Sequence, residues 1–309
     1  MANVSETNFS SSGGSHAYRE TVIIINCVLN APLMLISTMG NLLVLASILR
    51  TPSLRSPSIT LLCSLAVSDF LVGIVVQPLY IASELIRNSS LKQAMHVMAF
   101  ALCGVSLLTI TTISVDRLLA LHYHLRYPNL MTSHRAMCTS AMSWFISFLL
   151  GFLTVWNMTV YYVSVVIIIA ICVLVSTVCY IRIYGIVRQH RLQIHIQQRV
   201  VETENSQIQN NQTGNNQKVQ QWAKSAKNTF IYYVVMILCY TPVFISMSIL
   251  AISRHLWTNT WTLAETAALM NSSINPFLYC WRLRELRAAV IKTVRRMLRK
   301  QSEEDWLTN

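Results

Sequence analysis

Long apolar segments, almost free of charged residues, account for most of the chain. Five such segments occupy residues 21–49, 58–83, 93–115, 228–253 and 255–281. Each is long enough to cross a bilayer as a helix, which takes about 20 mostly apolar residues. A further segment, 136–181, carries no Asp, Glu, Lys or Arg and is long enough for two helices, with a turn at the polar residues 156–159. The pattern therefore predicts seven membrane-spanning helices.

These segments predict an all-α membrane protein, a seven-transmembrane helix bundle over residues 21–280. A β-barrel would instead show short segments of alternating apolar and polar residues, which the chain lacks. Residues 1–20 are polar and are expected to form an extracellular tail, and residues 301–309 a short cytoplasmic tail. Between the fifth and sixth spans, residues 191–221 include a run rich in Asn and Gln, a composition typical of a disordered loop.

The segment after the seventh span has a different pattern. Within residues 281–300, apolar residues recur at intervals of three or four positions, at Leu283, Leu286, Val290, Val294 and Met297. Arg and Lys occupy many of the other positions. We expect a basic amphipathic helix that lies on the anionic inner leaflet, so membrane lipids are expected partners.

Composition supports the membrane assignment. Only 12% of the residues are charged, whereas a soluble domain carries about 25%. The net charge is +12, but a nucleic-acid-binding protein presents its basic residues on a soluble face, so we expect no nucleic-acid partner. The positive charges instead indicate how the chain is oriented in the membrane. If the N-terminus is outside, 20 of the 24 Lys and Arg lie on the inner side, and the outer side keeps only Arg19, Arg87, Lys92 and Arg254.

This asymmetry indicates an extracellular N-terminus and a cytoplasmic C-terminus in the plasma membrane, because cytoplasmic loops carry the excess of Lys and Arg. Acceptor motifs for N-glycosylation agree with that orientation. The four that fall on the outer side begin at Asn3, Asn8, Asn88 and Asn157.

Ionisable residues inside spans are costly, so each is a candidate functional residue. Asp69 lies in the middle of the second span, and Asp116 and Arg117 are adjacent at the inner end of the third. Glu265 lies about half-way along the seventh span and could line an outer cavity together with Glu84 and His96. Prolines within the sixth and seventh spans, Pro242 and Pro276, permit kinks and hinge motion.

Short motifs follow one another in order along the predicted spans. They are Gly40-Asn41, Leu65-Ala66-Val67-Ser68-Asp69, Asp116-Arg117-Leu118, Trp144, Tyr180, Cys239-Tyr240-Thr241-Pro242 and Asn275-Pro276-Phe277-Leu278-Tyr279. In order and spacing, the chain resembles the rhodopsin-like (class A) G-protein-coupled receptors over roughly residues 21–300. One such motif alone is a weak signal, whereas seven in the matching spans are specific.

The resemblance implies a role for each motif residue. The buried sodium site of the family corresponds to Asp69, Ser106, Asn271 and Asn275, a carboxylate with hydroxyl and amide oxygens that suits a hard cation. The alternative is a polar network without an ion, and we expect no other cofactor. The activation switch corresponds to Asp116, Arg117, Tyr180, Pro242, Pro276 and Tyr279. Arg117 would be released on activation to meet a heterotrimeric G protein, while the sixth helix swings outward about Pro242.

The chain also departs from the family pattern. Lys92 stands where most relatives have a cysteine, so the usual outer disulfide is not expected, and Trp222 replaces an acid that often holds the arginine. The missing disulfide, together with a very short second outer loop and a fifth span with Cys172 in place of the usual proline, looks most like the melanocortin, cannabinoid, lysophospholipid and adenosine receptor group. These departures do not identify the ligand, which we expect to be an extracellular small molecule, lipid or peptide. The pocket is expected to be lined by Glu84, His96, Ala99, Phe100, Cys103, Tyr240, Phe244 and Glu265.

Three other functions can be weighed against that of a receptor. A chemosensory receptor would share the fold and differ only in ligand. An ion-coupled transporter or channel would use Asp69 and Glu265 as ion sites, but the chain shows neither a duplicated half nor a polar path through the membrane. A membrane enzyme is not expected, because no His, Cys and acid residues occur at metal-binding spacing and no nucleophile is paired with a base.

Overall fold

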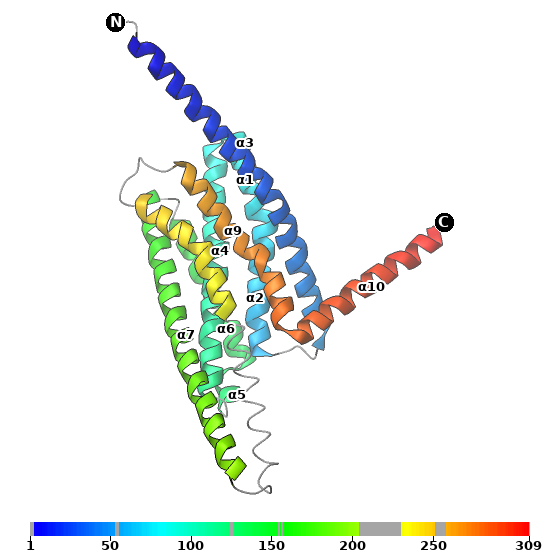
Figure 1. The fold of residues 1–309 in the computed structure, drawn as a ribbon. Coiled ribbons are helices and arrows are strands. Elements are labelled where there is room, and N and C mark those ends of the chain that lie inside the picture. The colour runs from blue at the N-terminus through cyan, green and yellow to red at the C-terminus, as the bar shows by residue number, and fades with distance from the viewer. Residues whose placement is uncertain are drawn as a thin grey trace.

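The computed structural model describes residues 3–52, 56–123, 126–153, 155, 157–203, 230–250 and 258–308. Within these residues, seven long helices form a bundle (Figure 1). They are α1 (Asn3–Leu49), the second span Pro57–Ile86, α4 (Ser89–His122), α6 (Ser133–Leu153), α7 (Met158–Thr203), the helix Phe230–Leu250 and α9 (Thr258–Arg282). The prediction of an all-α, seven-helix bundle is confirmed. We call the end of the bundle near Glu20 the outer end and the end near Arg117 the inner end, after the orientation expected from the charges.

Five of the helices are long and apolar enough to cross a membrane by length and composition alone. They lie at Glu20–Leu49, Pro57–Ile86, Ser89–His122, Thr159–Gln189 and Phe230–Leu250. The remaining two, α6 and α9, have 21 and 25 residues. Large apolar side chains on the outside of the bundle, such as Phe145 on α6 and Leu174 on α7, are more than 60% exposed. Such exposure is expected where lipid replaces water as the solvent.

The central helix is α4, which packs against the second span, α6 and α7. Its side chains Leu102, Val105 and Ser106 are completely buried. Polar residues tie the neighbouring helices together: Trp144 Nε1 donates to Ser64 Oγ at 3.0 Å, which joins α6 to the second span. A bundle in lipid depends on such bonds and on close packing, because lipid tails are as apolar as the helix surfaces.

Glycines allow two helix pairs to approach closely. A Cβ atom on Gly40 of α1 would lie 3.0 Å from the ring of Pro276 in α9. On Gly73 of the second span, it would lie 2.6 Å from Thr38 Oγ1 of α1. Small residues at helix contacts are the usual means of close packing in membranes. Both contacts bring α1 against the region around Asp69.

The second span is interrupted just after Asp69. It consists of α2 (Pro57–Leu71), a π-helical turn η2 (Val72–Val76) and α3 (Gln77–Ile86). The amide of Gln77 donates to the carbonyl of Val72, five residues earlier, and Pro78 has no amide hydrogen to donate. The wider turn changes the direction in which the side chains of α3 face, so it sets where Tyr80 and Glu84 lie.

Three boundaries differ from the expected ones. Helix α1 begins at Asn3, so most of the expected tail 1–20 has a helical backbone continuous with the first span. Helix α7 continues to Thr203, into the segment expected to be a loop from residue 191, and residues 204–229 lie outside the described residues. Helix α10 (Arg284–Thr308) follows the seventh span as predicted and extends beyond residue 300. Leu286, Ala289 and Thr293 are its buried positions, and α10 packs against α1.

Candidate functional site

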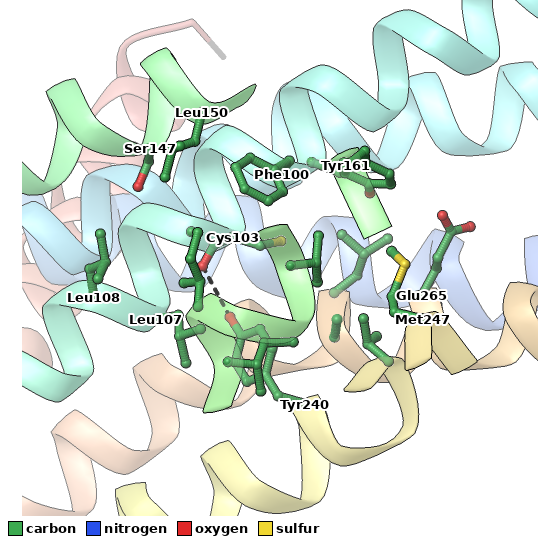
Figure 2. Close-up of a pocket in the computed structure, with 18 of the residues that line it drawn as sticks. Phe100, Cys103, Leu107, Leu108, Ser147, Leu150, Tyr161, Tyr240, Met247 and Glu265 are labelled. Carbon is green, nitrogen blue, oxygen red and sulfur yellow. Dashed lines mark hydrogen bonds between the residues drawn. The ribbon is translucent and has the colours of Figure 1, made fainter. Parts of the chain in front are cut away.

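A cavity of about 120 Å³ lies in the outer half of the bundle, between α4, α6, α7, the helix Phe230–Leu250 and α9 (Figure 2). Most of its wall is aliphatic or aromatic. Of the eight residues expected to form a pocket, five line this cavity: Ala99, Phe100, Cys103, Tyr240 and Glu265. The α4 residues among the lining run from Met95 to Leu108, so about four successive turns of this helix form one side of the cavity.

The other three expected pocket residues lie outside the cavity wall. The imidazole of His96 is next to it, with Nδ1 3.3 Å from Glu265 Oε1. Glu84 accepts a bond of 3.1 Å from Lys92 Nζ, so it forms an ion pair nearer the outer end. Phe244 is partly buried in the apolar core of the bundle.

An aromatic cluster adjoins the Glu265 end of the cavity. The ring of Tyr161 lies 5.7 Å from that of Phe100 and 5.9 Å from that of His96, and Trp261 lies 6.0 Å from His96. Sequence reasoning missed Tyr161 and Trp261. Their positions near the first residues of the fifth and seventh spans were the available signal, because aromatic residues are enriched at membrane interfaces.

Two tyrosine hydroxyls in the cavity wall already have partners. Tyr240 Oη donates to the carbonyl of Cys103 at 3.2 Å, which joins the sixth span to α4. Tyr80 Oη donates to the carbonyl of Thr262 at 3.1 Å and accepts from Asn26 Nδ2 at 2.7 Å. A ligand in the cavity therefore meets the rings of these tyrosines rather than free hydroxyls.

Behind Tyr80 lies a buried polar network that sequence reasoning also missed. Asn26 and Asn30 of α1 are completely buried. Asn30 Nδ2 donates to Thr266 Oγ1, and Thr266 Oγ1 donates to Asn26 Oδ1, both at 2.8 Å. These bonds join α1 to α9. The signal was present as two asparagines spaced four residues apart in an apolar run, which places them on one face of a helix.

Below the cavity, Asp69 is completely buried and accepts three hydrogen bonds. Its Oδ1 accepts from Ser106 Oγ at 2.9 Å and from Ser272 Oγ at 2.8 Å, and its Oδ2 accepts from Asn275 Nδ2 at 2.7 Å. The structure thus brings together three of the four residues expected at the sodium site and adds Ser272. The serine next to Asn271 could not be chosen from spacing, because adjacent residues on a helix differ by 100° in direction.

Asn271, the fourth expected sodium ligand, is 1% exposed and makes no side-chain hydrogen bond within the described residues. Asn275 Oδ1 is likewise buried without a partner there, and it lies one helical turn from Asn271 on the same face. Buried amide oxygens without partners, beside a carboxylate and two hydroxyls, fit a small hard cation. The residues present are therefore compatible with sodium.

At the inner end of α4, Asp116 and Arg117 form an ion pair, and Ser58 is hydrogen-bonded to both of them. Arg117 Nη2 donates to Asp116 Oδ2 and to Ser58 Oγ, and Ser58 Oγ donates to Asp116 Oδ2 at 3.0 Å. Asp116 is 2% exposed. The arginine is therefore held against α2 and its own helix.

The short helix α5 (Tyr127–Leu130) supplies a further bond to this pair. Tyr127 Oη donates to Asp116 Oδ1 at 2.7 Å. Burial, followed by the nearby negative charge of Asp116, raises the pKa of Tyr127 to about 12. The phenol therefore keeps its proton at neutral pH and acts as a donor to the carboxylate.

The other residues expected to belong to the switch lie on α7, α9 and the helix Phe230–Leu250. Tyr180 of α7 accepts from Ser114 Oγ at 3.3 Å, and its ring is 4.9 Å from that of Tyr233. Tyr279 of α9 is completely buried, with its ring 5.9 Å from Tyr232. Pro276 lies within α9, and Pro242 within the helix Phe230–Leu250. Trp222, expected to replace the acid that often holds the arginine, lies outside the described residues.

Two of the four glycosylation candidates are exposed at the outer end. Asn88 caps α4 by accepting from the amide of Ser90 at 2.9 Å, and Asn157 accepts from the amide of Thr159 at 2.8 Å. Asn3 and Asn8 lie on the first turns of α1, where only the backbone is described.

Comparison with known protein families agrees with this geometry. The family model described as "7 transmembrane receptor (rhodopsin family)" matches residues 40–161 and 152–279. Together the two matches cover most of the 309 residues. They begin at the motif Gly40-Asn41 and end at Tyr279, so they include the cavity, the surroundings of Asp69 and the pair at Arg117.

Proposed function

Since this chain belongs to the rhodopsin family of seven-transmembrane receptors, whose members are multi-pass membrane receptors rather than enzymes, we propose that it binds an extracellular ligand in the cavity and activates a heterotrimeric G protein at its inner end. One observation carries the proposal. The same helix, α4, lines the cavity with Ala99, Phe100 and Cys103 and ends at the restrained Arg117. A change at the cavity therefore has a rigid element through which to act.

The mechanism is a shift between two populated states. Tyr240 joins the sixth span to α4 through its bond to the Cys103 carbonyl, so a ligand against both helices alters their separation. Pro242, two residues on, supplies the hinge for outward movement of the sixth span. That movement frees Arg117 from Asp116 and lets Tyr180 and Tyr279 rearrange. A ligand drives this shift only as far as it binds the open state more tightly.

We also propose an allosteric sodium ion held by Asp69, Ser106, Asn275 and Ser272, with the amide of Asn271 one turn away. An ion there stabilises the closed arrangement, because it binds side chains of the second span, α4 and α9 together. The residues of the chain provide one carboxylate and several neutral oxygens, which is the donor set that a hard monovalent cation accepts.

The membrane arrangement follows from the charge distribution. The N-terminus is outside, with glycans on Asn3, Asn8, Asn88 and Asn157, and the C-terminus is in the cytoplasm. Helix α10 lies along the inner leaflet of the plasma membrane, where its Arg and Lys side chains meet anionic lipids.

The departures from the family pattern support the proposal that the chain is most similar to the melanocortin, cannabinoid, lysophospholipid and adenosine receptor group. A chemosensory role on the same fold is the alternative, and tissue expression separates it from a hormonal role. The apolar wall between Glu265 and Asp69 disfavours an ion-coupled transporter, since ions need a continuous polar path.

The test is a ligand-library screen with readouts for several G-protein classes, alongside an Arg117→Ala receptor. We expect a subset of ligands to produce signalling in the unmodified receptor, and the variant to reach the cell surface without signalling. Unchanged signalling in Arg117→Ala would show that the role given to Arg117 is wrong.

A further inference from the structure

The cavity beside Glu265 has a chemical character of its own. We infer that it takes a lipophilic amine, whose apolar body fills the cavity and whose protonated nitrogen binds the Glu265 carboxylate. The inference rests on the proposed function because it takes this cavity to be the ligand site. It adds the chemical class of the ligand.

One oxygen of the Glu265 carboxylate has no partner. The side chain is 12% exposed, and Oε2 is buried with no hydrogen bond within the described residues. Oε1 lies 3.3 Å from His96 Nδ1, but the two atoms do not meet hydrogen-bond geometry. A buried carboxylate oxygen without a partner is unfavourable, so a cation that reaches it gains a charge-assisted hydrogen bond.

Apart from His96, which lies beside Glu265, the basic side chains that the structure describes at the outer end are paired with other acids. Lys92 binds Glu84 at 3.1 Å, and Arg87 binds Glu20 at 2.9 Å. On the opposite wall, α4 presents Met95, Ala99 and Cys103, none of which is acidic. One carboxylate oxygen of Glu265 is therefore not paired with any described lysine or arginine side chain. Among the residues that line the cavity, Glu265 is the acidic one.

The rest of the wall requires an apolar body. Leu107, Ile169 and Met247 are among its side chains, and the hydroxyls of Tyr80 and Tyr240 bind elsewhere. The volume of about 120 Å³ compares with roughly 150 Å³ for an engineered apolar cavity that binds benzene. A single aromatic ring or a short alkyl chain therefore fits beside the nitrogen.

The cavity also adjoins the lipid-facing side of the bundle. Ile146 of α6 lines it and is 39% exposed on the outside, and α6 and α7 pack mainly against α4 rather than against each other. A single layer of side chains thus separates the cavity from lipid. A ligand with a large apolar part concentrates in lipid, which matches this position.

Other ligand classes fit less well. A carboxylate or phosphate would repel Glu265, and a sugar would leave several hydroxyls unpaired against an aliphatic wall. A neutral lipid would fill the cavity but leave Glu265 Oε2 without a cation. The discrimination between amine and neutral lipid is therefore the decisive measurement.

The experiment uses the purified full-length receptor in lipid nanodiscs, and it measures the shift in thermal unfolding midpoint with ligand concentration. The probes are n-butylamine, benzylamine and 2-phenylethylamine, which carry a short alkyl chain or a single aromatic ring, and each is paired with the alcohol of the same carbon skeleton. A ligand that binds only the folded state raises the midpoint in proportion to its affinity. We expect at least one amine to raise it, and its alcohol to bind at least about tenfold more weakly.

Two variants locate the interaction. Glu265→Gln keeps the size of the side chain and removes its charge, and we expect at least about tenfold weaker amine binding with little change for the alcohol. Glu84→Gln is the matched control, because this acid is equally near the outer end but lies outside the cavity and pairs with Lys92. We expect it to leave amine affinity within about twofold, the range of near-neutral contacts.

Each outcome decides the inference. If no amine raises the midpoint, if the alcohols bind as tightly, or if Glu265→Gln retains amine affinity, the inference is wrong. The comparison of amine with alcohol in the unmodified receptor needs no variant, so it decides the question even if Glu265→Gln does not fold. Binding is measured without a G protein. Amine binding without any G-protein signalling would therefore overturn the proposed function alone, and signalling by other ligands without amine binding would overturn this inference alone.

Discussion

The phenol of Tyr127 donates a hydrogen bond of 2.7 Å to the carboxylate of Asp116, from a four-residue helix outside the membrane spans. The bond adds a donor from the inner loop to an acid that Arg117 and Ser58 already hold. A restraint on Asp116 is also a restraint on Arg117, because the two side chains are paired. In the function proposed above, the inner loop is thereby coupled to the pair that would act as the activation switch.

Removing this bond is expected to raise signalling in the absence of ligand. Tyr127→Phe deletes the donor and leaves the ring in place, and a hydrogen bond to a charged group contributes roughly 1.5–3 kcal/mol. If half of that favours the closed state, ligand-free signalling rises about three- to tenfold. The measurement is G-protein signalling without ligand, normalised to surface expression.

The matched control is Tyr123→Phe. Tyr123 is 43% exposed, and its ring packs against that of the adjacent residue, His122, at the end of α4. It is expected to leave ligand-free signalling unchanged. Equal signalling by Tyr127→Phe and the unmodified receptor would mean that the Tyr127 bond persists in both states.

Much of the bundle was predictable because the bilayer imposes a length on each apolar segment, and a charge inside such a segment is rare. Asp69, Asp116, Arg117 and Glu265 were found by that reasoning alone. Partners were harder to predict, because they depend on the rotation of one helix relative to another. Glu84 is expected in the pocket from the sequence, but the structure pairs it with Lys92, in the first turn of the next helix, α4.

The π-helical turn after Asp69 illustrates the same limit. Pro78 was visible in the sequence, but whether a proline kinks, ends or widens a helix depends on which carbonyl its neighbour's amide reaches. Here Gln77 reaches back to Val72, and the turn directs Tyr80 toward Asn26. The bond between Asn26 and Tyr80 therefore depends on a local distortion that no residue type specifies.

Sodium is expected to stabilise the receptor through the Asp69 site. Replacing choline chloride by sodium chloride at constant ionic strength should raise the thermal unfolding midpoint by roughly a few degrees, since an ion that binds only the folded state adds RT ln(1 + [Na⁺]/Kd). Asp69→Asn should abolish the difference between the two salts. Glu84→Gln, which changes an acid outside the site, should retain it, and an equal salt response in all three receptors would argue against a sodium ion at Asp69.

Two buried serines are expected to respond in opposite ways to the same change. Ser272 Oγ donates to Asp69 at 2.8 Å, so Ser272→Ala removes a bond to a buried acid and should lower the free energy of unfolding by about 1–3 kcal/mol. Ser147 Oγ is buried in the cavity wall without a partner in the described residues, so Ser147→Ala should leave stability unchanged or raise it by up to about 1 kcal/mol. Thermal unfolding of both variants in one detergent measures the difference. A loss of stability in Ser147→Ala equal to that in Ser272→Ala would show that Ser147 has an unrecognised partner.

The two glycines Gly73 and Gly185 offer a test of the contact between α1 and the π-helical turn. A Cβ atom on Gly73 would lie 2.6 Å from Thr38 Oγ1 and 2.9 Å from the Thr38 amide nitrogen, so at least one helix must move. Gly73→Ala is therefore expected to lower the free energy of unfolding by about 1–3 kcal/mol, the usual cost of overpacking. Gly185 of α7 has nothing within 4 Å of the added atom, so Gly185→Ala should be neutral or stabilising by up to about 1 kcal/mol through helix propensity. The measurement is the thermal unfolding midpoint of each purified variant. Equal midpoints would mean that α1 lies further from the turn at Val72–Val76 than the structure places it.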